Sequence, residues 1–316
     1  MMRTAAIDCG TNSIRLLIAD TDETGGLTDV ERLMRVVRLG EGVDATGRLS
    51  DAALARTFAA AEEYAELIER HGSPEVRFVA TSASRDAENR EDFVAGIRER
   101  LGVDPEVISG AEEAALSFAG AVSVLGAAED ETVLVIDLGG GSTEFVAGNS
   151  SGVLASRSMD MGCVRFTERF LHGDPPTRAE ISAMEAEVTS LIVVAAAAVP
   201  LGTITTLVGV AGSITTVTAH ALKLPEYLPT RIHGTVLSTA EIGAAASDLL
   251  HSDRTTRAGL PYMHPGRVDV IGAGAFIWKC IVEAVTEATH GRVGGATASE
   301  HDILDGIALS VATRGK

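Results

Sequence analysis

Two short stretches of this sequence combine residue types at a spacing that suits phosphate chemistry. Asp8-Cys9-Gly10-Thr11-Asn12-Ser13 lies near the N-terminus, and Asp137-Leu138-Gly139-Gly140-Gly141-Ser142 lies near the middle. Each follows an apolar run typical of a buried strand, and each consists of a carboxylate, a glycine-containing turn and a hydroxyl. Glycine lets backbone N–H groups approach phosphate oxygens, whereas an aspartate repels phosphate and therefore indicates an intervening cation. Two such turns facing each other predict a site for a phosphate chain.

The carboxylates at the turns are candidate metal ligands. Asp137 and Glu144 flank the second turn, and we expect them on adjoining strands of a hairpin, where they could hold Mg²⁺ directly or through water. Asp8 could do the same from the first turn. Mn²⁺ is the alternative ion, and an activating monovalent cation is a further candidate. A lone strand-end aspartate usually stabilises its own turn instead, but the recurrence of the motif favours the metal.

Hydroxyl, amide and guanidinium groups are candidate phosphate ligands. A guanidinium beside Ser82 and Ser84 can hold phosphate through two N–H groups at once. Arg90 is equally well interpreted as a solvated helix residue. The candidates are Thr11, Asn12 and Ser13 in the first turn, Gly139, Gly140, Gly141 and Ser142 in the second, and Arg85 and Arg90 after an expected strand.

The elements that position these residues alternate between strand and helix, which indicates an α/β protein. Ile14–Asp20 and Phe145–Ala147 follow the two turns as expected return strands, so neither turn opens a helix as a P-loop or dinucleotide site would require. A helix is expected at Asp51–His71, with Ser50 as N-cap and Gly72 as its stop. Further strands are expected at Val76–Ala80, Glu106–Ser109, Val133–Ile136 and Val153–Ser158, and further helices at Asn89–Leu101, Ala111–Leu125 and Thr177–Val199.

The recurring Asp-x-Gly turn indicates an internal duplication and hence two domains. We expect residues 1–118 with 302–316 to form the first domain and residues 119–301 the second, the chain crossing between them near Gly126–Glu131. Tandem units with facing phosphate turns resemble the actin-like, sugar-kinase and Hsp70 architecture, which implies an active site in an interdomain cleft.

Composition limits the class of protein. The 316 residues include 44 acidic and 26 basic side chains, and the net charge of −18 argues against broad binding to nucleic acids or anionic membranes. A polyanionic ligand remains compatible with it if a divalent metal binds too. Cys9, Cys163 and Cys280 show no C-x-x-C spacing, which fits a reducing cytoplasm and neither a zinc site nor a disulfide framework.

No segment is expected to cross a membrane. The N-terminus lacks the pattern of a signal peptide. The longest apolar run, Leu191–Leu201, has eleven residues, fewer than the roughly 20 that a span needs, and is interpreted as a buried helix.

Several strings along the whole chain resemble the exopolyphosphatase and guanosine pentaphosphate phosphohydrolase family (Ppx/GppA). One such string would be weak evidence, but four in the family's order and spacing are specific, and further matches extend to Gly266–Ala275. The four are Asp8–Leu16, Ala80–Asn89, Ile108–Ala114 and Ile136–Glu144. The chain resembles the short, two-domain form of the family.

The resemblance implies a phosphoanhydride hydrolase. Its expected activity is Mg²⁺-dependent release of orthophosphate from the end of inorganic polyphosphate, or alternatively removal of the 5′ γ-phosphate of pppGpp. Glu113 matches the family's catalytic base, and its neighbour Glu112 is explained by the preference for acidic residues in a first helical turn. Gly212 and Ser213 resemble a third glycine loop that contacts the adenosine in nucleotide-binding relatives, and in this chain they could contact phosphates or guanosine.

Two readings from other classes remain open, an ATP-dependent kinase or ATPase and a non-catalytic sensor of polyphosphate or an alarmone. A kinase would leave the Ser-Gly-Ala-Glu-Glu-Ala string unexplained, and a sensor has no use for a water-activating Glu113 beside Asp137 and Glu144. The sequence leaves a homodimer open as well.

Overall fold

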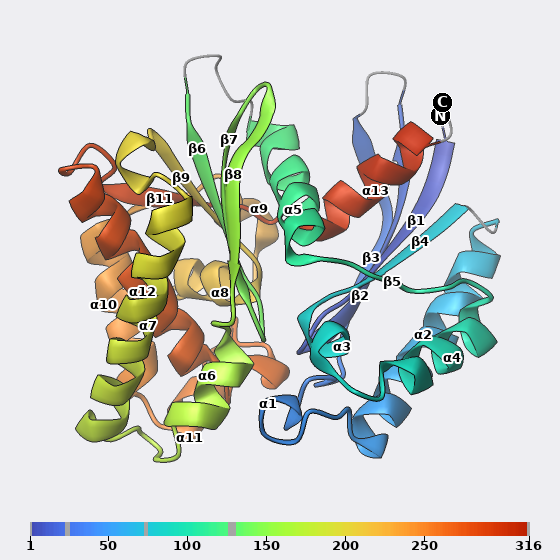
Figure 1. The fold of residues 1–316 in the computed structure, drawn as a ribbon, viewed down its shortest axis with the longest axis horizontal. Helices are drawn as coiled ribbons and strands as arrows, with labels where there is room; N and C mark the ends of the chain where they lie inside the picture. Colours follow the sequence, from blue (N-terminus) through green and yellow to red (C-terminus); the bar gives the residue numbers. More distant parts are fainter. Residues whose placement is uncertain (1, 23–25, 73–74, 126–130, 315–316) are drawn as a thin grey trace. The chain divides into compact units, whose positions relative to one another are not determined.

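Two compact units make up the chain in a computed structural model (Figure 1). The structure describes residues 2–22, 26–72, 75–125 and 131–314. The first unit contains Met1–Gly120 with Ile303–Lys316, and the second contains Ala121–Asp302. The expected domain limits and the cleft stay predictions. Of the expected crossing segment, residues 126–130 lie outside the described residues.

The first unit is built on a mixed five-stranded sheet with the order β3-β2-β1-β4-β5. The hairpins β1–β2 and β2–β3 are antiparallel, whereas β4 and β5 run parallel to β1 and to each other. The strands are β1 (Met2–Cys9), β2 (Ser13–Thr21), β3 (Leu27–Val36), β4 (Glu75–Ala80) and β5 (Glu106–Val107). The expected return strand after the first turn is therefore confirmed as β2, while β5 is shorter than expected.

The second unit repeats this topology in a sheet with the order β10-β11-β9-β6-β7-β8. Its strands β6, β7, β8, β9 and β11 pair in the same order and directions as β1 to β5, and β10 adds an antiparallel edge. The strands are β6 (Val133–Leu138), β7 (Thr143–Asn149), β8 (Gly152–Met159), β9 (Thr206–Val210), β10 (Val236–Ser238) and β11 (Gly295–Ala298). The duplication expected from the repeated turn is confirmed.

Helices cover both faces of the first sheet because its central strand β1 is apolar on both sides. Ile7 and Cys9 face the core beneath α2 and α4, and Ala6 faces the core beneath α5 and α13. Ser50 caps α2 as expected by accepting a hydrogen bond from the N–H of Ala53. The helices are α1 (Val43–Thr46), α2 (Asp51–Arg70), α3 (Ser82–Asp86), α4 (Arg90–Leu101), α5 (Gly110–Leu125) and α13 (Ile303–Arg314).

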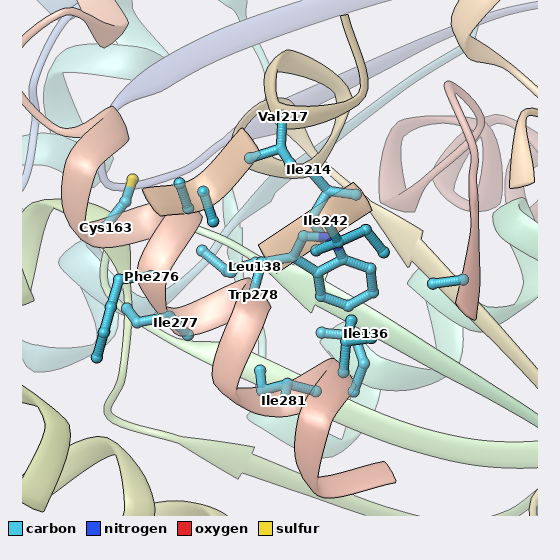
Figure 2. Close-up of a cluster of buried hydrophobic side chains, with 14 of the residues drawn as sticks. Ile136, Leu138, Cys163, Ile214, Val217, Ile242, Phe276, Ile277, Trp278 and Ile281 are labelled. Carbon is cyan, nitrogen blue, oxygen red and sulfur yellow. The ribbon is translucent and has the colours of Figure 1, made fainter. Parts of the chain in front are cut away.

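In the second unit the largest buried side chain is Trp278 of α12, which is 1% exposed. Figure 2 shows its ring near Ile136 of β6 and Ile242 of α10, so that the sheet strand carrying Asp137 is anchored in this cluster. The helices are α6 (Cys163–Phe170), α7 (Arg178–Ala198), α8 (Gly212–Ala221), α9 (Pro229–Ile232), α10 (Thr239–His251), α11 (Arg254–Ala258) and α12 (Ile271–Ala288), with short 3₁₀ turns at Leu201–Thr203 and Pro265–Arg267.

The interpretation of Leu191–Leu201 as a buried helix is wrong for part of its length. Val193 and Val194 are 64% and 44% exposed, whereas Ile192 and Ala195 lie in the core. Residues 191–198 of the run belong to the longer helix α7, which buries only the stripe that continues through Met184, and the rest of the run follows the end of that helix. Among the described residues, α7 is also the one helix long and apolar enough to cross a membrane by length and composition alone, a test that a core helix can pass.

Candidate active site

The first phosphate turn is a closed four-residue loop between β1 and β2. The N–H of Gly10 donates to the carbonyl of Ser13 at 3.0 Å. The carbonyls of Thr11 and Asn12 accept hydrogen bonds from the segment after β3, at 2.9 Å from Gly40 in the case of Thr11. Because C=O and N–H lie on opposite sides of a trans peptide, the N–H groups of Asn12 and Ser13 point away from that segment.

The second turn has the same closure and a more complete set of aligned donors. The N–H of Gly139 donates to the carbonyl of Ser142 at 3.0 Å. The carbonyls of Gly139, Gly140 and Gly141 accept hydrogen bonds from the N–H of Cys163 at 3.0 Å, the N–H of Val164 at 2.9 Å and Nε of Arg165 at 2.8 Å, respectively. The three N–H groups that follow these carbonyls, on Gly140, Gly141 and Ser142, therefore point away from α6. Successive N–H groups aligned in this way form an anion-binding concavity.

The two hairpins differ in the charge of the residue that lies opposite the aspartate. Asp8 is the register partner of Arg15 in β1–β2, and Asp137 is the register partner of Glu144 in β6–β7. Nε and Nη2 of Arg15 donate to Oδ2 of Asp8 at 2.9 and 2.6 Å. The first hairpin thus pairs its aspartate with its own arginine, whereas the second places two carboxylates on one face, where they could hold a cation.

The carboxylates of Asp137 and Glu144 fit a divalent cation. Asp137 and Glu144 are 7% and 1% exposed, and Ser158 donates to Oε1 of Glu144 at 2.7 Å. No cluster of three or more His, Cys, Asp or Glu side chains that could hold a metal occurs within the described ranges. Mg²⁺ does not need one, because it keeps several waters and binds one or two carboxylates together with substrate phosphates. The pairing of Asp8 with Arg15 favours the second hairpin over the first as the metal site.

The expected base lies against the expected phosphate-binding arginine in the first unit. Nη1 of Arg85, on α3, donates to Oε2 of Glu113 at 3.0 Å and to the carbonyl of Ile108 at 3.1 Å. Glu113 lies in the first turn of α5, and its side chain is 9% exposed, against 26% for Arg85. Ser109 precedes this turn and accepts a hydrogen bond from the N–H of Glu112 at 3.2 Å.

Hydroxyl groups join the first turn to α3. Thr11 and Ser82 share a hydrogen bond of 2.9 Å between their hydroxyl oxygens. Within the described part of the chain, Oγ of Ser84 and Oδ1 of Asn12 are among the few buried side-chain oxygens without a hydrogen-bond partner. Buried polar atoms are normally paired, so each of these two oxygens has capacity for a further polar partner.

Three other candidates are less well placed for substrate. Arg90 is 53% exposed at the start of α4 and pairs with Glu91 at 3.5 Å, as a solvated helix residue does. Ser213 is buried, and its hydroxyl interacts with the Cys163 thiol, which favours a packing role. Gly212, which begins α8, is covered by the guanidinium of Arg267, since a Cβ at this position would lie 2.4 Å from Cζ of that arginine.

The sequence reasoning missed Arg15, Ser158 and Arg165. Arg15 had a readable signal, because its spacing from Asp8 equals the spacing of Glu144 from Asp137. Ser158 and Arg165 had none, since their partners are set by strand pairing and by the approach of α6 to the turn.

Comparison with known proteins agrees with these features. The family model for the "Ppx/GppA phosphatase family" matches residues 17–311. The chain belongs to the Ppx/GppA phosphatase family. Exopolyphosphatase 2 of Mycobacterium tuberculosis (strain H37Rv) is 50% identical over 99% of both chains.

Solved structures of family members share the fold over the full chain. The crystal structure of an exopolyphosphatase-like protein is 45% identical, with a TM-score of 0.95 and coverage of 99% of this chain and 98% of the other. The Ppx/GppA family member of Aquifex aeolicus is 29% identical, with a TM-score of 0.79 and coverage of 100% and 99%. The duplicated α/β fold expected from the sequence is thereby confirmed.

Proposed function

We propose that this Ppx/GppA protein is an exopolyphosphatase that hydrolyses the terminal phosphoanhydride of inorganic polyphosphate and releases orthophosphate. The full-length similarity to exopolyphosphatase 2 supports polyphosphate as substrate. The observation that carries the proposal in the structure is the second hairpin, which combines a row of N–H donors with the facing carboxylates of Asp137 and Glu144. Such a site attracts a phosphate chain accompanied by a divalent cation.

Each unit contributes a different part of the chemistry. Glu113 takes a proton from the attacking water while the water oxygen bonds to the terminal phosphorus. The bond between that phosphorus and the bridging oxygen breaks, and its electron pair stays on the bridging oxygen of the shortened chain. Arg85, held against Glu113 at 3.0 Å, turns its remaining N–H groups to the terminal phosphate.

The backbone N–H groups of Gly140, Gly141 and Ser142, with those of Asn12 and Ser13, bind further phosphate oxygens. Asp137 and Glu144 would hold Mg²⁺, or Mn²⁺ in its place, which supplies neutralisation of the charge on the transferred phosphoryl group. Asp8 orients Arg15 within the first turn rather than holding the ion.

We place this activity in the cytoplasm, where Cys9, Cys163 and Cys280 would stay as the free thiols that the structure contains. pppGpp is the competing substrate, because it ends in the same phosphoanhydride.

Phosphate release tests the proposal. The purified chain is incubated with Mg²⁺ and, in parallel, with short-chain polyphosphate, long-chain polyphosphate, pppGpp or ATP. We expect the highest kcat/KM on polyphosphate. A higher kcat/KM on pppGpp would make pppGpp the substrate in place of polyphosphate. Phosphoryl transfer from ATP to an acceptor would support a kinase. Binding of polyphosphate without release of phosphate would support a sensor.

A further inference from the structure

Arg77 is a buried arginine that joins four elements of the first unit. It lies on β4 and its side chain is 4% exposed. Its guanidinium donates to Glu106 of β5 at 3.1 and 2.8 Å, to Glu112 of α5 at 2.7 Å and to Ser310 of α13 at 2.7 Å. Burying a guanidinium costs free energy unless its N–H groups are hydrogen-bonded, and these contacts supply hydrogen-bond acceptors for the N–H groups of Arg77.

The contact with Glu112 is notable because Glu112 is the residue before the proposed base. Glu112 pairs with Arg77, and Glu113 pairs with Arg85 at 3.0 Å. Consecutive residues of an α-helix point about 100° apart around its axis. The apolar face of α5 packs in the core through Ala114 and Leu116, and the two ion pairs hold the polar side of its first turn from two different directions.

We propose that Arg77 and Glu112 form a positioning pair that sets the rotation of the first turn of α5 and thereby aims the Glu113 carboxylate. The inference rests on the proposed function, in which Glu113 is the base. Stabilisation of the helix dipole explains an acidic residue in this turn, but it does not require a buried arginine from β4 as its partner. Arg77 is a positioning residue, since it acts on the reaction through Glu112.

Glu106 offers a matched control. Glu106 and Glu112 both bind Arg77, and their side chains are 38% and 45% exposed. Glu106 makes two hydrogen bonds to the guanidinium and Glu112 makes one, but only Glu112 lies on α5. If Arg77 has a purely structural role, Glu106→Gln should lower stability and activity more than Glu112→Gln does. If Arg77 and Glu112 position the base, Glu112→Gln should lower kcat more than Glu106→Gln does.

The experiment compares Glu106→Gln and Glu112→Gln by steady-state kinetics on polyphosphate across pH, with thermal unfolding beside it. We expect Glu112→Gln to lower kcat about tenfold or more with little change in KM, because small misplacements of a reacting group are costly. Glu106→Gln should keep kcat within about twofold while melting at the same or a lower temperature. The pH at which kcat falls on the acidic side of the profile should be the same in both variants as in the wild type.

Three results would overturn the positioning pair. The first is an equal kcat for the two variants, and the second is an unchanged kcat for Glu112→Gln. The third is a loss of kcat in Glu112→Gln that a shift of the acidic side of the pH profile explains, because the charge of Glu112 would then act on Glu113 directly. In the Arg77→Met background, Glu112→Gln should cause no further loss of kcat. If Arg77→Met does not fold, the Glu106 and Glu112 pair still decides the matter.

Glu113→Gln, measured in the same series, separates this inference from the proposed function. Full activity of Glu113→Gln would remove the proposed base and the positioning pair together. An inactive Glu113→Gln with identical behaviour of Glu106→Gln and Glu112→Gln would remove the positioning pair alone.

Discussion

Asp137 and Glu144 are direct register partners across the β6–β7 hairpin, and both carboxylates are almost fully buried. The equivalent position of the first hairpin holds Asp8 opposite Arg15, an ion pair. The duplicated fold therefore contains one hairpin whose aspartate is paired with an arginine and one that places two carboxylates opposite each other, and this difference supports the proposed role of the second unit in metal binding.

Removing one carboxylate from this pair should separate stability from activity. We expect Glu144→Gln to fold but to bind Mg²⁺ weakly, because only one of the two facing carboxylates remains. Mg²⁺ should raise the melting temperature of the wild type but not of Glu144→Gln, which should also lose phosphate release. Thermal unfolding with and without Mg²⁺ checks this, and an equal Mg²⁺ shift in both proteins would argue against the site.

Gly162 should be required for the shape of the second phosphate turn. Its φ of −149° is open to any residue, but a Cβ there would lie 2.4 Å from the carbonyl carbon and oxygen of Gly140. Gly162→Ala must therefore displace the turn, and we expect it to lower kcat/KM about 100-fold. Gly243 of α10 has open space around it, so Gly243→Ala should keep activity and gain about 0.5–1 kcal/mol of stability. Comparable activity of the two variants would contradict the account.

Arg85 and Arg90 are both candidate phosphate ligands, and their surroundings in the structure differ. Arg85→Met removes the ion pair with Glu113 and, in the proposed mechanism, a charged contact to phosphate, so we expect kcat/KM to fall about 10- to 100-fold. Arg90→Met, at an exposed position paired with Glu91, should stay within about twofold. Steady-state kinetics on polyphosphate checks both variants, and an equal loss of kcat/KM in the two would indicate that Arg90 also binds phosphate.

Glu180 should stabilise the protein in a pH-dependent manner. Hydrogen bonds from the backbone N–H and hydroxyl of Thr177, and from the N–H of His172, lower the pKa of Glu180 to about 2. Because that pKa is about 4.3 in an unfolded chain, the stabilisation is complete above that pH and is lost as the pH falls toward about 2. Glu180→Gln should therefore unfold at lower urea than the wild type at neutral pH.

The gap between the two urea midpoints should narrow in acid, and a gap that widens as the pH falls would oppose this explanation. Glu185, an exposed glutamate of the same helix, provides the control substitution Glu185→Gln, which should leave the midpoint near that of the wild type.

The sequence predicted elements whose signals are local. An apolar run, a glycine turn and a second run of branched residues predicted both hairpins, and Ser50 with the spacing that follows it predicted α2. The exposed side of α7 escaped prediction because its apolar residues continue around the helix, so composition did not reveal which stripe the sheet covers.

Side-chain pairings between elements that are distant in the chain could not be predicted from the sequence. Arg77 reads as an ordinary strand residue, and its partners Glu112 and Ser310 come from helices that only the folded unit brings to β4. The pairing of Arg85 with Glu113 was likewise missed, although each residue had been assigned a role from its motif.

The central claim, that Glu113 activates water for attack on a terminal phosphate, is tested most directly by single-turnover phosphate release from polyphosphate with Glu113→Gln. The account predicts a rate about 10²- to 10⁴-fold below that of the wild type, with polyphosphate still bound and Mg²⁺ still stabilising the protein. A rate close to that of the wild type would contradict it and require another group to activate the water.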